Sequence, residues 1–269
     1  MNFSVLMSVY YKEQAKYLRE ALDSVFNQTL QADEVVLVED GPLTKELDKV
    51  IEEYQNKYKE LKLIKLTENG GLGKALNEGL KHCSFDIVAR MDTDDICKPQ
   101  RFEKQINFLF SHPEIDIVSS WIEEFVGSKE NIKSIRKLPE NNEDIFRFGK
   151  KRNPINHPAV AFRKQALEKV GSYQHFPLFE DYYLWVRMLM NGAKFHNLQE
   201  SLLYFRASED MFKRRGGRKY AKDEIRFQKQ CLKLGYINFF EFLRNISIRF
   251  VARIVPNGLR EKIYKTIRK

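Results

Sequence analysis

The sequence predicts an α/β protein in which a mostly parallel β-sheet is covered by helices. In the first half of the chain, short runs of β-branched and aliphatic residues alternate with stretches whose apolar residues recur at helical spacing. This alternation is typical of strand–helix–strand units. The chain has 269 residues, of which 43% are hydrophobic, so it is also long enough to bury the core that such a sheet requires.

The first third of the chain contains four predicted strands, each a short apolar run that ends at a turn: residues 4–10, 34–39, 61–66 and 86–91. After the first strand, apolar residues every three or four positions predict a helix with one buried stripe: Leu18, Leu22, Val25 and Phe26. The same spacing after the second strand predicts another helix with the stripe Leu47, Val50, Ile51 and Tyr54. Such strand and helix units in succession indicate a nucleotide-binding type of fold.

The second half of the chain is less regular. It predicts a strand at 159–162, a helix at 181–190, a short strand near 202–205 and a helix at 220–234 that closes the globular part. We therefore expect one domain over residues 1–235 and an amphipathic helical tail over 236–269. Pro256 and Gly258 divide that tail into two pieces.

Charge is concentrated in the tail, where eight basic residues stand against two acidic ones, while the whole chain carries +9. No zinc-ligand spacing, helix-turn-helix signal or RNA-binding signature accompanies this charge, which argues against a nucleic-acid partner. Basic and apolar residues interleave in the tail, so we expect it to lie on an anionic membrane surface; packing against the domain is the alternative. No apolar run is long enough to span a bilayer and no signal peptide is evident, so we expect a cytoplasmic protein, peripheral at the inner face of the membrane.

The three cysteines are an odd number without metal-site spacing, and they predict reduced thiols with no assigned role.

Polar residues follow all four predicted strands of the first half. Ligands in open α/β sheets bind beyond the carboxyl ends of the strands, so these four loops are expected to converge on one rim. In chain order the loop residues are Tyr10, Tyr11 and Glu13; Glu39, Asp40 and Gly41; Asn69, Gly70 and Gly71; and Asp92, Asp94 and Asp95.

Three carboxylates lie within four positions after the fourth strand, at Asp92, Asp94 and Asp95. Mg²⁺ and Mn²⁺ prefer oxygen ligands and are commonly held by one or two carboxylates together with substrate phosphates. A short acidic motif also matches by chance, and taken alone it is more often a solvated turn. The other loops must therefore decide between the two interpretations.

Two of those loops have both a functional and a structural interpretation. Glu39 and Asp40 can accept a hydrogen bond from a base or ribose, or they can form a turn with Gly41 and Pro42. The glycine-rich loop over 69–77 opens a helix, so free backbone N–H groups and Lys74 can face phosphates. The alternative for this loop is a flexible turn with a solvated lysine.

In their order and spacing, these motifs resemble those of a family 2 glycosyltransferase of the GT-A fold, the inverting type found in bacterial polysaccharide and lipopolysaccharide assembly. The resemblance covers residues 3–215. The residues that carry it are Val9, Tyr10, Glu13, Glu39, Asp40, Gly41, the loop 69–77, the string 90–95, Pro99, Arg101, Asn156, His157, Pro158, Glu180, Asp181, Trp185, Arg187, Arg206, Arg214 and Arg215.

The resemblance implies transfer of a single sugar from a nucleotide-diphosphate donor, with a UDP-sugar favoured, to a hydroxyl of a lipid-linked or oligosaccharide acceptor. Asp181 would be the general base, and Asp92 and Asp94 would meet the ribose and the diphosphate bridged by Mn²⁺ or Mg²⁺. This agrees with the chemistry, since inverting transfer needs a proton acceptor for the attacking hydroxyl and a cation for the leaving diphosphate.

The resemblance also implies a donor pocket that extends over several loops. The residues expected there are Tyr10, Glu13, Glu39, Asp40, Asn69, Lys74, Arg90, Thr93, Arg206, Arg214 and Arg215. The usual D-D-G-S string reads Glu39-Asp40-Gly41-Pro42 here, so which acid contacts the base stays open. Around the acceptor, Glu180, His157 and Trp185 are expected in secondary roles, although a structural histidine and a helix N-terminus that favours acids are equally good explanations.

Two other function classes fit the sequence less well. A sugar-phosphate nucleotidyltransferase needs a Gly- and Arg-rich phosphate loop after the first strand, and residues 10–13 contain no Gly or Arg. A non-catalytic membrane-surface protein of the same fold would have no need of Asp92, Asp94 and Asp181. The chain also lacks the Q-x-x-R-W string of processive synthases of this family, which predicts a single addition.

Overall fold

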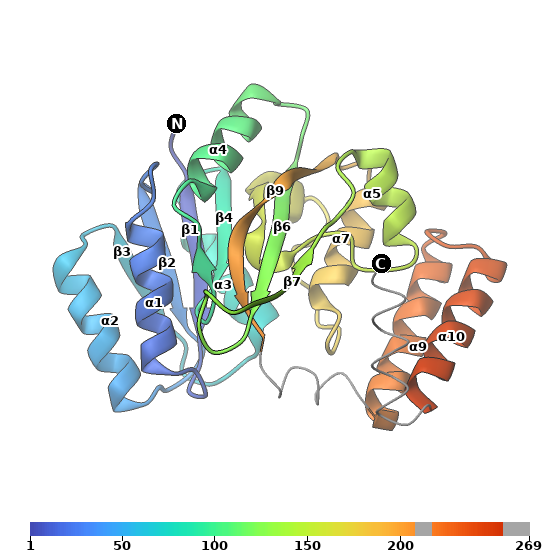
Figure 1. Cartoon of the computed structure of the whole chain (residues 1–269), viewed down its shortest axis with the longest axis horizontal. Helices are drawn as coiled ribbons and strands as arrows, with labels where there is room; N and C mark the ends of the chain where they lie inside the picture. The colour runs from blue at the N-terminus through green and yellow to red at the C-terminus, as the bar shows by residue number, and fades with distance from the viewer. Residues whose placement is uncertain (208–216, 255–269) are drawn as a thin grey trace.

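The computed structural model describes residues 1–207 and 217–254, with side chains for 1–207 and 220–248. It confirms the α/β class: one sheet crosses the molecule with helices on both faces (Figure 1). The first half contains, in order, β1 (Ser4–Val9), α1 (Ala15–Phe26), β2 (Glu34–Glu39), α2 (Lys45–Lys57), β3 (Leu61–Lys65), α3 (Leu72–His82) and β4 (Ile87–Asp92).

These four strands are parallel, as predicted, and lie in the order β3-β2-β1-β4. The chain leaves β1 in one direction for β2 and β3 and then returns to the other side of β1 for β4. Such a reversal of strand order opens a crevice at the carboxyl ends of the two strands. Ser8 of β1 pairs with both Val38 of β2 and Asp92 of β4, so the polar loops begin side by side.

Side chains of alternate residues along β1 and β2 point to opposite faces of the sheet. Val5, Met7 and Val9 belong to one core with α1 and α2. Leu6 belongs to a second core that α3 and α7 cover. Because both faces are buried, the strands read as continuous apolar runs. On the second face α3 approaches closely, since a Cβ at Gly79 would lie 2.4 Å from Leu6 Cδ1.

The second half completes the sheet with mixed strand directions. Its elements are β5 (Ile96–Cys97), α4 (Arg101–Ser111), β6 (Ile117–Phe125), β7 (Ile132–Arg136), α5 (Asn142–Gly149), the 3₁₀ helix η1 (His157–Ala159), β8 (Ala161–Arg163), α6 (Lys164–Glu168), α7 (Glu180–Met190), β9 (Phe195–Arg206), α9 (Gly217–Lys233) and α10 (Phe239–Ile254). β8 runs antiparallel between β4 and β6, and β9 runs parallel to β6. The expected strand near 202–205 is the end of the longer β9, and β6 and β7 were not predicted.

The two C-terminal helices stand side by side at the end of the molecule opposite α1 and α2 (Figure 1). Asn245 of α10 donates to Gln228 Oε1 of α9 at 2.9 Å and to the Lys150 carbonyl at 2.8 Å. Lys150 also lies 3.1 Å from Glu241. The beginning of the predicted tail therefore packs against the rest of the chain, while the boundary at residue 235 stays a prediction.

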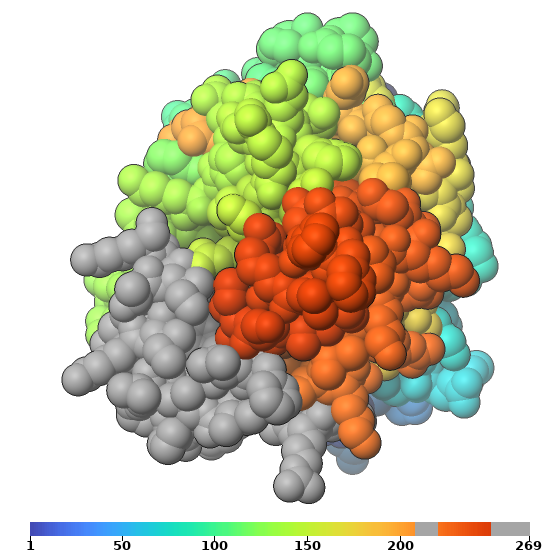
Figure 2. Space-filling model, turned by 90° about the vertical axis from the view of Figure 1, so that its right-hand side faces the viewer, coloured from blue at the N-terminus to red at the C-terminus, as the bar shows by residue number. Residues whose placement is uncertain are grey.

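The outer side of α10 faces solvent, and α10 protrudes from the face shown in Figure 2. Four large apolar side chains are exposed along it: Phe239, Phe240, Leu243 and Ile248. Residues 255–269, with the predicted break at Pro256 and Gly258, lie outside the described residues. Within the described part of the chain, none of the helices combines the length and apolar character needed to cross a lipid bilayer.

Candidate active site

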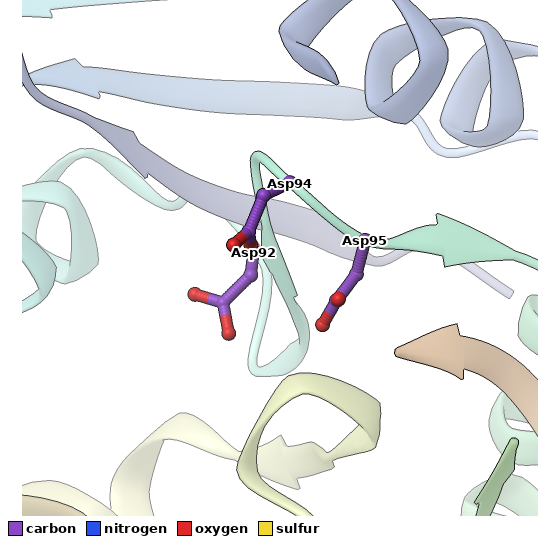
Figure 3. A group of neighbouring side chains, drawn as sticks. All are labelled: Asp92, Asp94 and Asp95. Carbon is purple, nitrogen blue, oxygen red and sulfur yellow. The ribbon is translucent and has the colours of Figure 1, made fainter. Parts of the chain in front are cut away.

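Three aspartates gather at the turn that follows β4. Asp92 is the last residue of that strand, and the chain then turns through Asp94 and Asp95 into β5. One carboxylate oxygen from each of the three lies within 4.8 Å of the others. Figure 3 shows the three side chains projecting to the same side of the turn. The predicted convergence of these acids is therefore present.

Burial and mutual repulsion make this cluster costly without a cation. Burial, then the charges of Asp92 and Glu13, raise the pKa of Asp94 to about 7. Burial and the charges of Asp94 and Asp92 hold the pKa of Asp95 well above its ordinary value. Asp95 Oδ2 is buried and has no hydrogen-bond partner. Three close carboxylates with an unsatisfied oxygen fit a divalent cation.

Arg90 supports Asp92 from inside the protein. Its side chain is 1% exposed, and Nη1 donates to Asp92 Oδ2 at 2.7 Å while Nη2 donates to Oδ1. The fork is bidentate, a geometry that fixes a carboxylate in one orientation. Arg90 was expected to bind the donor, but in this structure its guanidinium is buried and pairs with Asp92, so its contact to the site runs through that carboxylate.

Arg206 supports the same turn from the other side. Its Nε donates to the Asp94 carbonyl at 2.8 Å, its backbone N–H donates to Asp95 Oδ1 at 2.8 Å, and Nη2 pairs with Glu20. The guanidinium also lies 3.9 Å from the ring centroid of Tyr17. Arg206 was expected to close over the diphosphate, but these contacts make it a support of the acidic turn. The expected partners Arg214 and Arg215 lie outside the described residues.

The glycine-rich loop is fastened to the end of β2 by Asp40. The Asp40 carboxylate accepts hydrogen bonds from Asn69 Nδ2 at 3.0 Å, from Gly70 N–H at 2.7 Å and from Gly71 N–H at 3.0 Å. Gly41 makes this contact possible, since it has φ +80° and a Cβ there would lie 2.5 Å from Asn69 N. The N–H groups of Gly70 and Gly71 are thus committed to Asp40, and the phosphate role predicted for the start of this helix stays a prediction for the N–H groups that follow and for Lys74.

Of the two acids at the end of β2, Glu39 has a carboxylate oxygen that accepts no hydrogen bond, whereas both oxygens of Asp40 are bonded. Its side chain is buried, and Oε1 accepts a long hydrogen bond of 3.4 Å from Lys65 Nζ. Oε2 lies 3.1 Å from the same nitrogen but makes no hydrogen bond. Lys74 lies on the solvent side of the glycine-rich loop and lines a hollow of about 390 Å³ together with Thr67 and Glu68.

The loop after β1 contacts the acidic turn. Thr93 Oγ1 lies 3.2 Å from the Ser8 carbonyl and 3.4 Å from Glu13 Oε2. Burial raises the pKa of Glu13, and the charge of Asp92 raises it further. Tyr10 is partly exposed beside Tyr11, with their ring centroids 5.9 Å apart. Tyr10, Glu13 and Thr93 are thus placed on the same rim as the aspartates.

Asp181 lies in the first turn of α7, where the helix dipole favours a carboxylate. Its Oδ2 accepts a hydrogen bond of 2.6 Å from Asn153 Nδ2. Burial raises the pKa of the Tyr173 hydroxyl, and the charges of both Asp181 and Asp92 raise it further. Tyr173 therefore lies within electrostatic reach of both Asp181 and Asp92.

The beginnings of α3 and α7 are also neighbours. A Cβ at Gly73 of the glycine-rich loop would lie 3.7 Å from Glu180 Cγ. Burial and the charge of Asp181 raise the pKa of Glu180. Glu180 therefore lies next to the glycine-rich loop and Asp181, and its secondary role at the acceptor stays a prediction.

His157 and Trp185 are neighbours, the first half-buried and the second in the core. His157 Nε2 is 2.8 Å from the Tyr173 hydroxyl, and burial, then the Arg90 charge, hold its pKa well below the ordinary value. Trp185 is fully buried with its ring 5.8 Å from that of His157. The structural interpretation of His157 fits these contacts, and Trp185 packs beside it in the core; the acceptor roles expected of both stay predictions.

Three residues of this region had no predicted role. Asp95 was seen as the third acid of the turn, and its burial and open oxygen now place it in the cluster. Asn153 and Tyr173 lie in irregular segments without any pattern that marks them. The three cysteines are free thiols, each buried.

Comparison with known proteins identifies the family of this chain. Residues 4–171 match Glycosyl transferase family 2. A protein of Escherichia coli named UDP-Gal:alpha-D-GlcNAc-diphosphoundecaprenol beta-1,3-galactosyltransferase is 42% identical over 266 residues, 99% of this chain and 96% of that protein. The amylovoran biosynthesis glycosyltransferase AmsE of Erwinia amylovora is 41% identical over 99% of both chains.

The fold has solved counterparts. The crystal structure of Staphylococcus aureus TarS 1–349 in complex with UDP-GlcNAc has a TM-score of 0.67 and 22% identity, covering 86% of this chain and 67% of that chain. In a longer TarS structure, with a TM-score of 0.66, this protein spans 43% of the length. The GT-A fold implied by the sequence motifs is thus confirmed. With an acidic turn at the carboxyl edge of its sheet and relatives along its whole length, the chain belongs to glycosyl transferase family 2 and is a glycosyltransferase.

Proposed function

We propose that this enzyme transfers one sugar from a UDP-sugar to a hydroxyl of a diphosphate-linked lipid acceptor, with inversion at the anomeric carbon and with Mn²⁺ or Mg²⁺. The observation that carries the proposal is the cluster of Asp92, Asp94 and Asp95; it is supported by Asp181, whose charge acts on Tyr173 as that of Asp92 does. A cation site and a separate carboxylate are the two groups that inverting transfer requires.

Asp181 would accept the proton of the acceptor hydroxyl. The hydroxyl oxygen would attack C1 of the donor sugar while the bond from C1 to the UDP oxygen breaks. Asp94 and Asp95, with Asp92, would hold the cation, which neutralises charge on the departing diphosphate. Glu39 Oε2, buried without a hydrogen bond, would accept from the N–H of the uracil ring. Tyr10, Glu13, Asn69, Lys74 and Thr93 would line the donor pocket; Arg214 and Arg215 keep the donor role that the motifs imply.

The acceptor and the membrane belong to the same proposal. The E. coli relative carries a diphosphoundecaprenol acceptor in its name. The tail of this chain carries an excess of basic residues, and α10 exposes Phe239, Phe240, Leu243 and Ile248. An exposed apolar stripe next to cationic residues is typical of helices that lie in the headgroup region of anionic bilayers. The enzyme would thus work at the cytoplasmic face of the membrane in polysaccharide synthesis.

The test is a transfer assay with defined substrates. The enzyme is incubated with UDP-galactose, UDP-GlcNAc or GDP-mannose, with Mn²⁺ or EDTA, and a synthetic alkyl diphosphate carrying α-linked GlcNAc. Products are identified by mass spectrometry and the anomeric coupling by proton NMR. We expect one added sugar from a UDP donor, β-linked, and only with the metal. A product of retained configuration, a metal-independent reaction, or no transfer from either UDP donor would contradict the proposal.

A further inference from the structure

Asn153 makes a short hydrogen bond to the carboxylate proposed as the base. Its Nδ2 lies 2.6 Å from Asp181 Oδ2. The two residues belong to different segments, since Asp181 is in the first turn of α7 and Asn153 precedes η1. A hydrogen bond to a charged acceptor is roughly twice as strong as one between neutral groups. This contact therefore bears directly on how the Asp181 carboxylate is oriented.

The Asn153 amide is itself held in place. Its Oδ1 accepts from the Ile155 N–H at 3.3 Å, and its carbonyl accepts from Arg136 Nη2 of β7 at 3.0 Å. The next residues are tied to the sheet: Asn197 Nδ2 of β9 donates to the Pro154 carbonyl at 3.2 Å. Asn156 Nδ2 donates to the Ser120 carbonyl of β6 at 2.7 Å. Residues 153–156 are therefore held to the sheet by several hydrogen bonds, and the Asn153 side-chain N–H is directed at Asp181.

We propose that Asn153 is a positioning residue that fixes the Asp181 carboxylate for proton transfer, leaving its other oxygen to receive the acceptor hydroxyl. The proposal rests on the proposed role of Asp181 as the base. Because Oδ1 of Asn153 accepts from the Ile155 N–H, the Asn153 amide presents N–H to Asp181 and holds Oδ2 of that carboxylate. General bases need this placement to within hydrogen-bond reach of the proton they remove.

The substitution Asn153→Asp tests the hydrogen-bond donor alone, because Asp has nearly the same shape as Asn. It keeps an oxygen for the Ile155 N–H, removes the donor and places a second carboxylate beside Asp181. Two adjacent carboxylates hold a shared proton, as like charges disfavour ionisation of both. Tyr173 and Glu180 are the other titratable groups whose pKa the Asp181 charge raises, and neither changes in this variant. A shared proton blocks the base until the pH is high enough to remove it.

The experiment measures kcat for transfer from UDP-galactose between pH 5.5 and 9, together with UDP binding in Mn²⁺. For Asn153→Asp we expect kcat to fall about 10- to 100-fold at neutral pH and to recover as the pH rises, with the acid limb displaced upward. Asn153→Ala should lose a similar factor without the pH displacement. Both variants should bind UDP as the wild type does.

Asn131→Asp is the matched control, since Asn131 Nδ2 also donates to an oxygen, the Val126 carbonyl, in the exposed turn between β6 and β7. It should leave kcat and its pH profile unchanged. An Asn153→Asp enzyme with a wild-type profile, or one that loses UDP binding and kcat in parallel, would overturn the inference. Asp181→Asn separates the two proposals: if it transfers normally the base assignment itself fails, and if it is inactive while Asn153→Asp is normal only the positioning role fails.

Discussion

Replacing Asp94 by Asn tests the electrostatics of the acidic turn. In the metal-free protein the Asp94 carboxyl has a pKa of about 7 against an ordinary value of 3.8, through burial and the charges of Asp92 and Glu13. A folded state with a raised pKa binds more protons than the unfolded chain between these two values. Stability is therefore fully present below the lower value and is lost as the pH rises through the upper one.

The size of the effect follows from the difference between the two pKa values. For an isolated carboxyl it amounts to on the order of 4 kcal/mol at pH 8. The proton is shared with Asp92, Asp95 and Glu13, so we expect about 2 kcal/mol to be recovered when Asp94 becomes an uncharged Asn. For a protein of this size that corresponds to a rise in Tm of about 4–8 °C. At pH 5 the gain should be less than half as large.

The assay is thermal unfolding in EDTA at pH 5 and pH 8, followed by the same measurement with Mn²⁺ and UDP. The control is Glu52→Gln, which removes one exposed carboxylate from α2 and should change Tm by little at either pH. Mn²⁺ with UDP should raise the Tm of the wild type and leave that of Asp94→Asn almost unchanged. An Asp94→Asn protein that is no more stable than the wild type at pH 8, or that gains equally at both pH values, would refute the reasoning.

Three further predictions address the base, the glycine-rich loop and the membrane. Asp181→Asn should lower kcat for transfer by about 10²- to 10⁴-fold while UDP binding by calorimetry stays unchanged; a loss of binding would contradict the base assignment. Asp40→Ala leaves the Gly70 and Gly71 N–H groups without their acceptor, so the KM for UDP-galactose should rise about tenfold, and an unchanged KM would show that the loop does not shape the donor site. Phe240→Glu should weaken sedimentation with phosphatidylglycerol vesicles and leave transfer to a short-chain soluble acceptor intact; equal vesicle binding by both proteins would exclude this face of α10.

The fold was predictable where the local pattern and the topology agree. The four apolar runs of the first half predicted the four parallel strands correctly. Both faces of the sheet are covered, so each strand is largely apolar and is easily recognised in the sequence. Once β1 and β4 are neighbours, the acids that follow them must lie on one edge. The cluster of Asp92, Asp94 and Asp95 follows from that geometry alone.

The supporting residues could not be predicted, because their partners come from distant parts of the chain. From the sequence, an arginine next to an acidic motif can equally well bind a phosphate or hold the acidic residues in place. Only the burial of Arg90 and Arg206 in the structure favours the second role. The sequence suggested that Asp40 contacts the nucleotide base, but its carboxylate accepts hydrogen bonds from Gly70 and Gly71, which are 30 and 31 residues away. Asn153 sits in an irregular segment, and no periodicity links it to Asp181.

A crystal structure of the Asp181→Asn variant with UDP-galactose and Mn²⁺ would test the central claim most directly. We expect the ion at about 2 Å from a carboxylate oxygen of Asp94 and from oxygens of the diphosphate. The sugar C1 should then face residue 181 across the space where an acceptor hydroxyl would enter. An ion bound away from the turn after β4, or a sugar whose C1 faces away from residue 181, would contradict the account.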